Sequence, residues 1–308
     1  MEATNAFLLG ASLPMAIAST YLVLIPKIPN PTTFADFRPI NLCTFVNKVI
    51  SKLIANRMAG FLPSIISKEQ SGFVREREIV DNIMLAQELV ASMGLPNRGR
   101  NMEIKLDMEK AYDRLDWQLL IGFAESWINI LFKSLSQSWF SPIINGAAVG
   151  FIKSFRGVRR GDPLSPTLFI IATEILSRNL NKMGHRPSFS RFHTTSGCPL
   201  ITHISYADDV LIFSSGDMHR VRQICQMLRR YEASSGNKAK CSIAAVDLPF
   251  AVEENKAAIN GFHIMAPLHV SWMSDGMWKE ECCSLRLSHL QDKGENIMMA
   301  QQDSFHGR

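Results

Sequence analysis

Three aspartates lie beside apolar runs of sequence and carry the clearest chemistry in the chain. Asp208 and Asp209 are adjacent between two short apolar segments, and Asp107 lies 101 residues before Asp208 at the end of another. Adjacent carboxylates repel one another, and a bound cation relieves that repulsion. Oxygen ligands with no His or Cys among them favour Mg²⁺ or Mn²⁺ over zinc. The three acids therefore indicate a site for hard divalent cations.

Such a site has a definite chemistry. Two divalent ions about 4 Å apart can activate a hydroxyl and stabilise a leaving pyrophosphate during in-line nucleotidyl transfer. From the residues alone, an ordinary alternative stays open, because Asp is frequent in turns and often only solvated at a strand end. A Gly-Asp-Pro loop at residues 161–163, between the two acidic strand ends, favours the catalytic interpretation.

Hydrophobic patterns predict strands around these acids. Residues 103–108 alternate between apolar and charged side chains, which is typical of a half-buried strand. Residues 201–213 predict two short strands joined by a turn that contains the two adjacent aspartates. We expect a small antiparallel sheet, with helices packed on one face, that brings Asp107 beside Asp208.

The remaining segments with a clear pattern are mostly helical. An Asn-Gly pair between apolar flanks in residues 143–155 is a strong hairpin signal. The start of the chain predicts a helix followed by a strand at residues 21–25. Apolar residues at helical spacing predict helices over residues 45–62, 79–93, 110–123, 166–180 and 218–233.

Composition narrows the class of protein. The chain has 308 residues, 46% apolar and 9% aromatic, which excludes a disordered chain, a collagen and a disulfide-dense miniprotein. Six scattered cysteines, none in a Cys-x-x-Cys pair, are expected to be reduced thiols. The net charge is +5, and residues 1–249 carry 28 basic against 20 acidic side chains. This balance suits a polyanionic partner, although many ordinary basic proteins share it.

Residues 3–26 contain no charged side chain. Glu2 precedes this segment and Pro14 interrupts it, which argues against a signal peptide. Polar residues at positions 19–21 break the roughly 20 continuous apolar residues that a membrane span requires. We therefore expect no signal peptide, no transmembrane segment, no membrane partner, and a location in the cytoplasm or nucleus. Nothing in the sequence indicates a protein partner.

Several ordered blocks of sequence carry a family resemblance. They are LVLIPKIPNPTTFADFRPINLCTFVNKVISKLIANRM, QSGFVREREIVDNIMLAQELV, IKLDMEKAYDRLDW, RRGDPLSPTLFIIATEILSR and ITHISYADDVLIF. In wording and order the chain resembles the reverse transcriptase of LINE-type (non-LTR) retrotransposons, as found in plants, over roughly residues 3–245.

The resemblance implies an α+β fold of the polymerase right-hand type. We expect a fingers region in residues 1–100 and a palm, which contains the small antiparallel sheet and the catalytic motifs, in residues 101–245. Residues 246–308 are an unassigned, divergent tail that we expect to be poorly ordered. No thumb is identified.

The resemblance also implies an activity, RNA-directed DNA polymerisation by two-metal transfer of nucleotides from dNTPs to a primer 3′-OH. The implied partners are an RNA template, a DNA primer and dNTPs, and the implied cofactors are two Mg²⁺ ions, for which Mn²⁺ can substitute. Asp107 matches the first metal-binding carboxylate of the palm. Asp208 and Asp209 match the pair of the Tyr-x-Asp-Asp turn, with Asp208 the more direct ligand.

Five further positions match nucleotide-binding residues of the family. Tyr112 matches the residue beneath the incoming sugar, where a bulky ring excludes a 2′-hydroxyl. Arg38 and Arg77 match basic positions that grip the triphosphate. Gly161 matches a loop glycine that lets the backbone approach template or nucleotide, and Lys240 matches a proton donor to pyrophosphate. Without the family, Tyr112 has the alternative of core packing and the three cations that of solvated surface charge.

Two positions depart from the family pattern. Arg160 stands where the family has Gln, and Arg only donates hydrogen bonds whereas Gln also accepts them. Glu76 stands where the family has Gly, and its charge repels a triphosphate. Two hypotheses stay open: an active polymerase, or a truncated, catalytically inactive retrotransposon remnant with at most weak nucleic-acid binding. A third, an RNA-templated RNA polymerase, is disfavoured by Tyr112 and by the GDPLSP wording.

Overall fold

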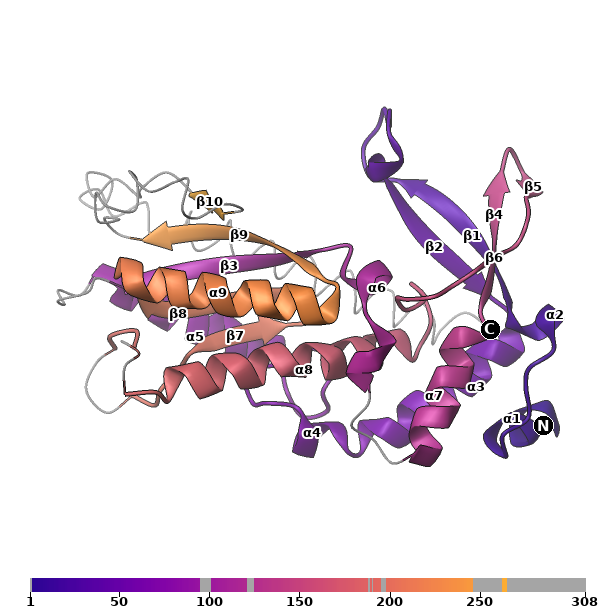
Figure 1. Cartoon of the computed structure of the whole chain (residues 1–308), viewed down its shortest axis with the longest axis horizontal. Coiled ribbons are helices and arrows are strands. Elements are labelled where there is room, and N and C mark those ends of the chain that lie inside the picture. Colours follow the sequence, from indigo (N-terminus) through magenta and orange to yellow (C-terminus); the bar gives the residue numbers. More distant parts are fainter. Residues whose placement is uncertain are drawn as a thin grey trace. The chain divides into compact units, whose positions relative to one another are not determined.

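The computed structural model describes residues 2–94, 101–120, 125–187, 189, 191–194, 198–245 and 262–264 (Figure 1). The chain forms two compact units that interleave along the sequence. The first comprises Met1–Ile66, Lys110–Glu174 and Ala233–Asn237. The second comprises Ser67–Glu109, Ile175–Glu232 and the described part of Lys238–Arg308. Each unit has its own sheet.

The first unit is built on a sheet with the strand order β2-β1-β4-β5. Strand β1 (Ser19–Pro26) pairs antiparallel with β2 (Phe37–Cys43) and parallel with β4 (Trp139–Ile144). The short strands β5 (Ala147–Ala148) and β6 (Ile152–Lys153) both pair with β4. The described helices of this unit are α1 (Glu2–Leu8), α2 (Met15–Ala18), α3 (Phe45–Ala59), α4 (Leu62–Ile65), α6 (Ala111–Arg114), α7 (Glu125–Ser136) and the first turns of α8 (Ser165–Gly184), with 3₁₀ turns at Phe34–Asp36 and Trp117–Leu120.

Capping and apolar spacing explain helix α3. The Thr44 side chain accepts a hydrogen bond from the backbone N–H of Asn47 at 3.4 Å and so caps the helix. Ile50 and Ile54, four residues apart, are buried on one face. The predicted amphipathic helix is therefore confirmed, although it breaks near Gly60 and resumes as α4.

The predicted hairpin is also confirmed. Asn145 and Gly146 join β4 to β5 and have positive φ angles of 51° and 80°. A two-residue type I′ turn requires positive φ at both positions, which Asn and Gly tolerate.

The helix predicted over residues 110–123 is wrong. In its described part only the single turn α6 and a 3₁₀ turn form. Carbonyls that a longer helix would use internally accept hydrogen bonds from a distant loop instead. The Val158 N–H donates to the Tyr112 carbonyl at 2.7 Å, and the Gly157 N–H donates to the Leu115 carbonyl at 2.8 Å. Each carbonyl is satisfied by this loop, so the helix is not extended.

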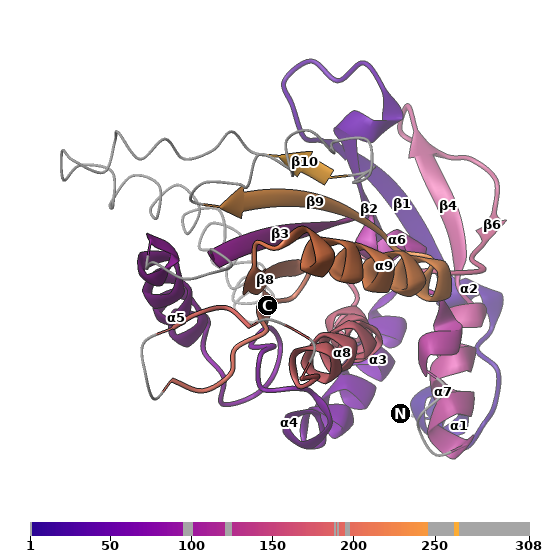
Figure 2. The ribbon, with the colours of Figure 1, turned by 60° about the vertical axis from the view of Figure 1, so that its left-hand side comes forward.

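The second unit is built on a sheet with the strand order β10-β9-β3-β8-β7 (Figure 2). Strand β3 (Asn101–Glu109) pairs antiparallel with β8 (Asp209–Ser215) on one side and with β9 (Lys238–Ala245) on the other. Strand β7 (His203–Tyr206) pairs antiparallel with β8, as predicted from residues 201–213. The described helices are α5 (Ile79–Ala91), the later turns of α8 and α9 (Met218–Ser235), with a 3₁₀ turn at Ser92–Gly94.

The two faces of this sheet are both covered by helices. Met102, Ile104 and Leu106 alternate along β3 and are fully buried. Helix α9 and the later turns of α8 run along one face and α5 lies on the other (Figures 1 and 2). Helix α5 packs Leu89 against Phe213, whose side chain lies on the face opposite to that of its neighbour Ile212. The expected helices on one face are present as α8 and α9, and α5, which precedes β3 in the chain, adds apolar cover for Phe213 on the other face.

Strand β10 (Phe262–Ile264) pairs parallel with β9 and was not predicted. The rest of the predicted tail, residues 246–308, lies outside the described residues. The assignment of residues 1–100 to fingers and 101–245 to a palm stays a prediction, because compactness alone does not define these functional regions. Among the described residues, Cys43 and Cys225 are free cysteines. Among the described helices, none combines the length and apolar character that a membrane crossing requires.

Candidate active site

The register of the second unit's sheet aligns two of the three aspartates. Asp107 of β3 lies directly opposite Asp209 of β8. Paired residues in an antiparallel ladder have Cα atoms about 4.5–5.5 Å apart and side chains on the same face. Asp208 immediately precedes Asp209 in the turn between β7 and β8, so all three aspartates gather at one end of the sheet. The residue opposite Asp107 is thus one position beyond the expected Asp208.

The three carboxylates differ in exposure. Asp107 is exposed, Asp208 is half-buried and Asp209 is 4% exposed. Like charges that face each other directly across a ladder destabilise a sheet. A hard cation between Asp107 and Asp209 would remove this repulsion, so the donor set fits a divalent ion such as Mg²⁺.

The described part of the chain contains no group of three or more His, Cys, Asp or Glu side chains arranged to hold a metal ion. Mg²⁺ does not need such a cage, because it usually keeps several waters and binds through one or two carboxylates together with substrate phosphates. The absence of such a group among the described residues therefore does not exclude a divalent ion at the aspartates of β3 and β8.

Lys240 and Tyr206 extend the row of aspartates across the sheet. Lys240 of β9 stands opposite Asp107, and Tyr206 of β7 stands opposite Asp209. Lys240, the predicted proton donor, is thus paired in register with Asp107, the first predicted metal ligand. Burial raises the pKa of the Tyr206 phenol above its usual range.

Gln70 holds the turn that carries the aspartates, and no role was predicted for it. Its Oε1 atom accepts hydrogen bonds from the backbone N–H groups of Gly72 at 2.8 Å and of Ala207 at 2.9 Å. Its Nε2 atom donates to the Ala207 carbonyl at 3.3 Å. Ala207 has a φ of +53°, a conformation that L residues rarely adopt, and these hydrogen bonds stabilise it. The only signal in the sequence was the Gln-Ser-Gly wording of the second resembling block.

Gly72 lies so close to the backbone of Ala207 that no larger residue fits at this position. A Cβ atom at Gly72 would lie 2.6 Å from the Ala207 nitrogen. The neighbouring backbone is also paired, since the Ser71 N–H donates to the Ser205 carbonyl at 3.1 Å and the Ser205 N–H donates to the Glu69 carbonyl at 2.9 Å. The segment before α5 is therefore docked along β7 and its turn.

Arg77 supports the same segment. Its Nη1 atom donates to the carbonyls of Ser67 at 2.6 Å and Gln70 at 2.7 Å. The guanidinium is half-buried, and the adjacent Glu76 is exposed. The predicted contact of Arg77 with a triphosphate stays a prediction beside this structural role.

In the first unit, Tyr112 follows β3 at the start of α6. Its ring stacks on Phe169 of α8, with centroids 5.0 Å apart and planes 12° apart. Tyr112 is half-buried, so the ring is held in place while part of it stays exposed. Arg38 lies on β2 opposite Ile25 and is exposed.

The loop before α8 contains two arginines in different environments. Arg159 forms a buried ion pair with Asp162 at 2.6 Å, and the Ser51 hydroxyl donates to the same carboxylate at 3.0 Å. Arg160, which replaces the family's Gln, forms a partly exposed ion pair with Asp113 at 3.0 Å. The loop is therefore anchored to α3 through Asp162 and to α6 through Arg160.

Gly161 follows with a φ of +88°. The left-handed region is readily available to glycine, and the loop turns there toward α8. The Asn41 N–H donates to the Arg160 carbonyl at 3.1 Å, which joins this turn to β2.

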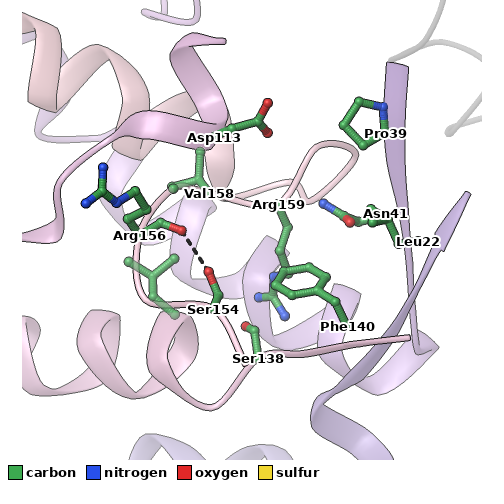
Figure 3. Close-up of a pocket in the computed structure, with 12 residues that line it drawn as sticks. Leu22, Pro39, Asn41, Asp113, Ser138, Phe140, Ser154, Arg156, Val158 and Arg159 are labelled. Atoms are coloured by element: carbon green, nitrogen blue, oxygen red, sulfur yellow. Dashed lines mark hydrogen bonds between the residues drawn. The ribbon is translucent and has the colours of Figure 1, made fainter. Parts of the chain in front are cut away.

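A cavity of about 220 Å³ lies beside this loop (Figure 3). Its wall includes Asn41 and Phe140 of the sheet, Asp113, and Arg159 of the loop. The Nε and Nη1 atoms of Arg159 and the Oδ1 atom of Asn41 are buried and have no hydrogen-bond partner in the described part of the chain. The cavity therefore has a mixed polar and apolar lining.

Comparison with known proteins identifies the family. The family model for reverse transcriptase (RNA-dependent DNA polymerase) matches residues 25–273. The chain belongs to this family. The catalytic type of the reverse transcriptase domain is therefore RNA-directed DNA polymerisation, as the sequence blocks implied.

Two curated proteins illustrate the similarity of this reverse transcriptase domain to transposon proteins. The transposon TX1 uncharacterized 149 kDa protein of Xenopus laevis is 29% identical over 252 residues, which is 78% of this chain and 18% of that protein. The retrovirus-related Pol polyprotein from the type-1 retrotransposable element R2 of Popillia japonica is 25% identical over 218 residues, 68% of this chain and 29% of that protein. The chain thus spans less than a third of either relative.

A solved structure supports the fold. The structure of apo telomerase from Candida tropicalis matches with a TM-score of 0.50 at 12% identity, over 79% of this chain and 48% of that chain. The α+β reverse transcriptase fold predicted from the sequence is confirmed.

Proposed function

We propose that this chain is the reverse transcriptase domain of a non-LTR retrotransposon of the plant LINE type, and that it extends a DNA primer on an RNA template. The observation that carries the proposal is the direct pairing of Asp107 with Asp209 in neighbouring strands. The wording of the sequence blocks supports the plant type. We place the activity in the cytoplasm or nucleus, where template and primer occur.

Asp107, Asp208 and Asp209 are the proposed ligands of two Mg²⁺ ions, with Mn²⁺ as a substitute. When bound, these ions activate the primer 3′-OH and stabilise the leaving pyrophosphate. The exposure of Asp107 supports its access to the primer end, and the burial of Asp209 supports a mainly positioning part for that carboxylate.

The other predicted residues have proposed roles around the nucleotide. Tyr112, supported by its stack on Phe169, excludes the 2′-hydroxyl of a ribonucleotide. Arg38 and Arg77 bind the triphosphate, and Gly161 lets the backbone approach the template. Lys240, in register with Asp107, donates a proton to the pyrophosphate.

The alternative is an inactive remnant. The ion pair between Arg160 and Asp113 favours it, because a guanidinium held by a carboxylate cannot reproduce the acceptor of the family's Gln. The intact row of aspartates favours the enzyme.

A primer-extension assay distinguishes an active polymerase from an inactive remnant. The purified protein is given an RNA template, a DNA primer, dNTPs and Mg²⁺, with Asp107→Asn and Asp208→Asn as test variants. Asp81→Asn on α5, an exposed aspartate of the same unit, is the matched control. We expect extension by the wild type and the control and its loss in both test variants. No extension by folded wild-type protein, with Mn²⁺ also tried, would establish the remnant.

A further inference from the structure

A groove of about 230 Å³ lies on the second unit between α8 and α9, outside the row of aspartates. Three exposed cations line it: Lys182 near the end of α8, Arg186 just after it, and Arg230 on α9. No acidic residue is among the residues that line it. Within the described part of the chain, none of these cations forms an ion pair.

The surrounding helix surface has the same charge. Helix α9 contains four arginines and a single glutamate. A basic helix face is often only solvated, but here the cations converge on a hollow that also has other binding groups. The amides of Asn179, Gln223 and Gln226 line its walls, and Met183 and Phe189 supply an apolar floor.

This combination matches one class of ligand. Guanidinium and ammonium groups bind phosphate oxygens, with Arg able to bind two at once. Side-chain amides hydrogen-bond to sugar and base edges, and an apolar floor accepts the face of a base. Three cations along one groove favour the repeated charge of a phosphodiester backbone over a protein partner.

We propose that this groove binds the phosphodiester backbone of a single-stranded nucleic acid, as a contact separate from the polymerase site. The sheet lies between the two: strand alternation puts Asp107 on the same face as Phe213, which packs with α5, whereas α8 and α9 run along the opposite face (Figure 1). The groove therefore holds a different segment of nucleic acid from the one at the aspartates. Binding in this groove requires neither the metal ions nor the catalytic aspartates.

The test compares two charge-matched double variants in the full chain. Arg186→Gln with Arg230→Gln removes two groove cations, and Arg222→Gln with Arg229→Gln removes two exposed arginines of α9 that do not line the groove. Fluorescence anisotropy measures the binding of a short single-stranded RNA and of DNA of the same sequence across a salt series. Two lost phosphate contacts lower the slope of log affinity against log salt by about 1.4. Between 50 and 200 mM salt the wild type should then lose about sevenfold more affinity than the groove variant.

A second measurement locates the contact. RNA that carries 4-thiouridine is cross-linked to the wild type, and we expect adducts on the α9 peptide of residues 223–229. Loss of affinity and slope in the groove variant alone, for RNA and DNA, supports the phosphodiester proposal, and loss for RNA alone assigns the groove to RNA. Equal losses in both variants, or no loss with cross-links only elsewhere, would overturn it. Primer extension by the same proteins reports the polymerase site independently.

Discussion

The side-chain oxygen of Gln70 accepts a hydrogen bond from the backbone N–H of Ala207 at 2.9 Å, although 137 residues separate the two in the sequence. This contact holds the turn in which Asp208 and Asp209 follow Ala207. Because Gln70 is 3% exposed, its side chain has no water to replace the bonds that it makes. The position of two proposed metal ligands therefore depends on a buried amide from outside the sheet.

Replacing Gln70 by Leu should weaken the response to Mg²⁺. The N–H groups of Gly72 and Ala207 would lose their acceptor, at a cost of about 1–3 kcal/mol each. We expect the turn to shift and the Mg²⁺ concentration for half-maximal primer extension to rise. Gln87→Leu, an exposed glutamine on α5, is the matched control and should change nothing. A lower melting temperature with an unchanged Mg²⁺ titration would contradict the positioning role.

Gly72→Ala should destabilise the fold, whereas Gly60→Ala should not. The added Cβ at Gly72 would meet the Ala207 nitrogen at 2.6 Å, but at Gly60 it meets nothing within 4 Å. The backbone at Gly60 is right-handed helical, where Ala is favoured by about 0.4–1 kcal/mol. Thermal unfolding of the two variants checks this contrast. Equal melting temperatures would mean that the Gly72 contact is not rigid.

Two consecutive arginines should respond differently to the same substitution. Arg159→Gln breaks an ion pair whose side chains are 4% and 2% exposed and leaves Asp162 buried with its charge, which typically costs about 3–5 kcal/mol. Arg160→Gln breaks a pair that is 25% and 39% exposed and should cost at most about 1 kcal/mol. Because Arg160→Gln restores the family residue, we also expect it to increase primer extension. Denaturant unfolding measures the free energy of unfolding of both variants. An Arg159→Gln variant as stable as Arg160→Gln would refute the predicted difference.

Tyr112→Ala should relax the choice of sugar. The ring stacked on Phe169 is the proposed barrier to a 2′-hydroxyl, and Ala removes it. Incorporation of ribonucleotides relative to deoxynucleotides should rise in Tyr112→Ala and stay at the wild-type ratio in Tyr112→Phe. Single-nucleotide extension with each substrate gives this ratio. An unchanged ratio in Tyr112→Ala would assign the ring to packing alone.

The stability of the protein should fall between pH 9 and pH 11 in part because of Cys225. Burial raises the pKa of this thiol from 9.0 to about 11. The unfolded chain loses the thiol proton above pH 9 while the folded chain keeps it, so the free energy of unfolding falls with rising pH across this interval. Cys225→Ala should show a smaller fall than the wild type in denaturant unfolding at pH 8, 9 and 10. If the free energy of unfolding falls equally with pH in Cys225→Ala and in the wild type, the thiol does not contribute to the pH dependence.

Local sequence was sufficient for most of the elements that position the site. The alternation in residues 103–108 predicted β3, and helical spacing predicted α5 and α9. The Asn145-Gly146 turn followed from the φ angles that those residues tolerate. These features depend on neighbours within a few residues, so periodicity and turn chemistry determine them.

Long-range contacts decided the remainder. The helix predicted from residue 110 ended early because the backbone of Val158 bonds to the Tyr112 carbonyl. The pairing of Asp107 with Asp209, the support from Gln70 and the different burial of Arg159 and Arg160 depend on strand register and on partners up to 137 residues away. No local pattern encodes such partners, because the hydrogen bonds and burial that select them exist only once the sheet has assembled.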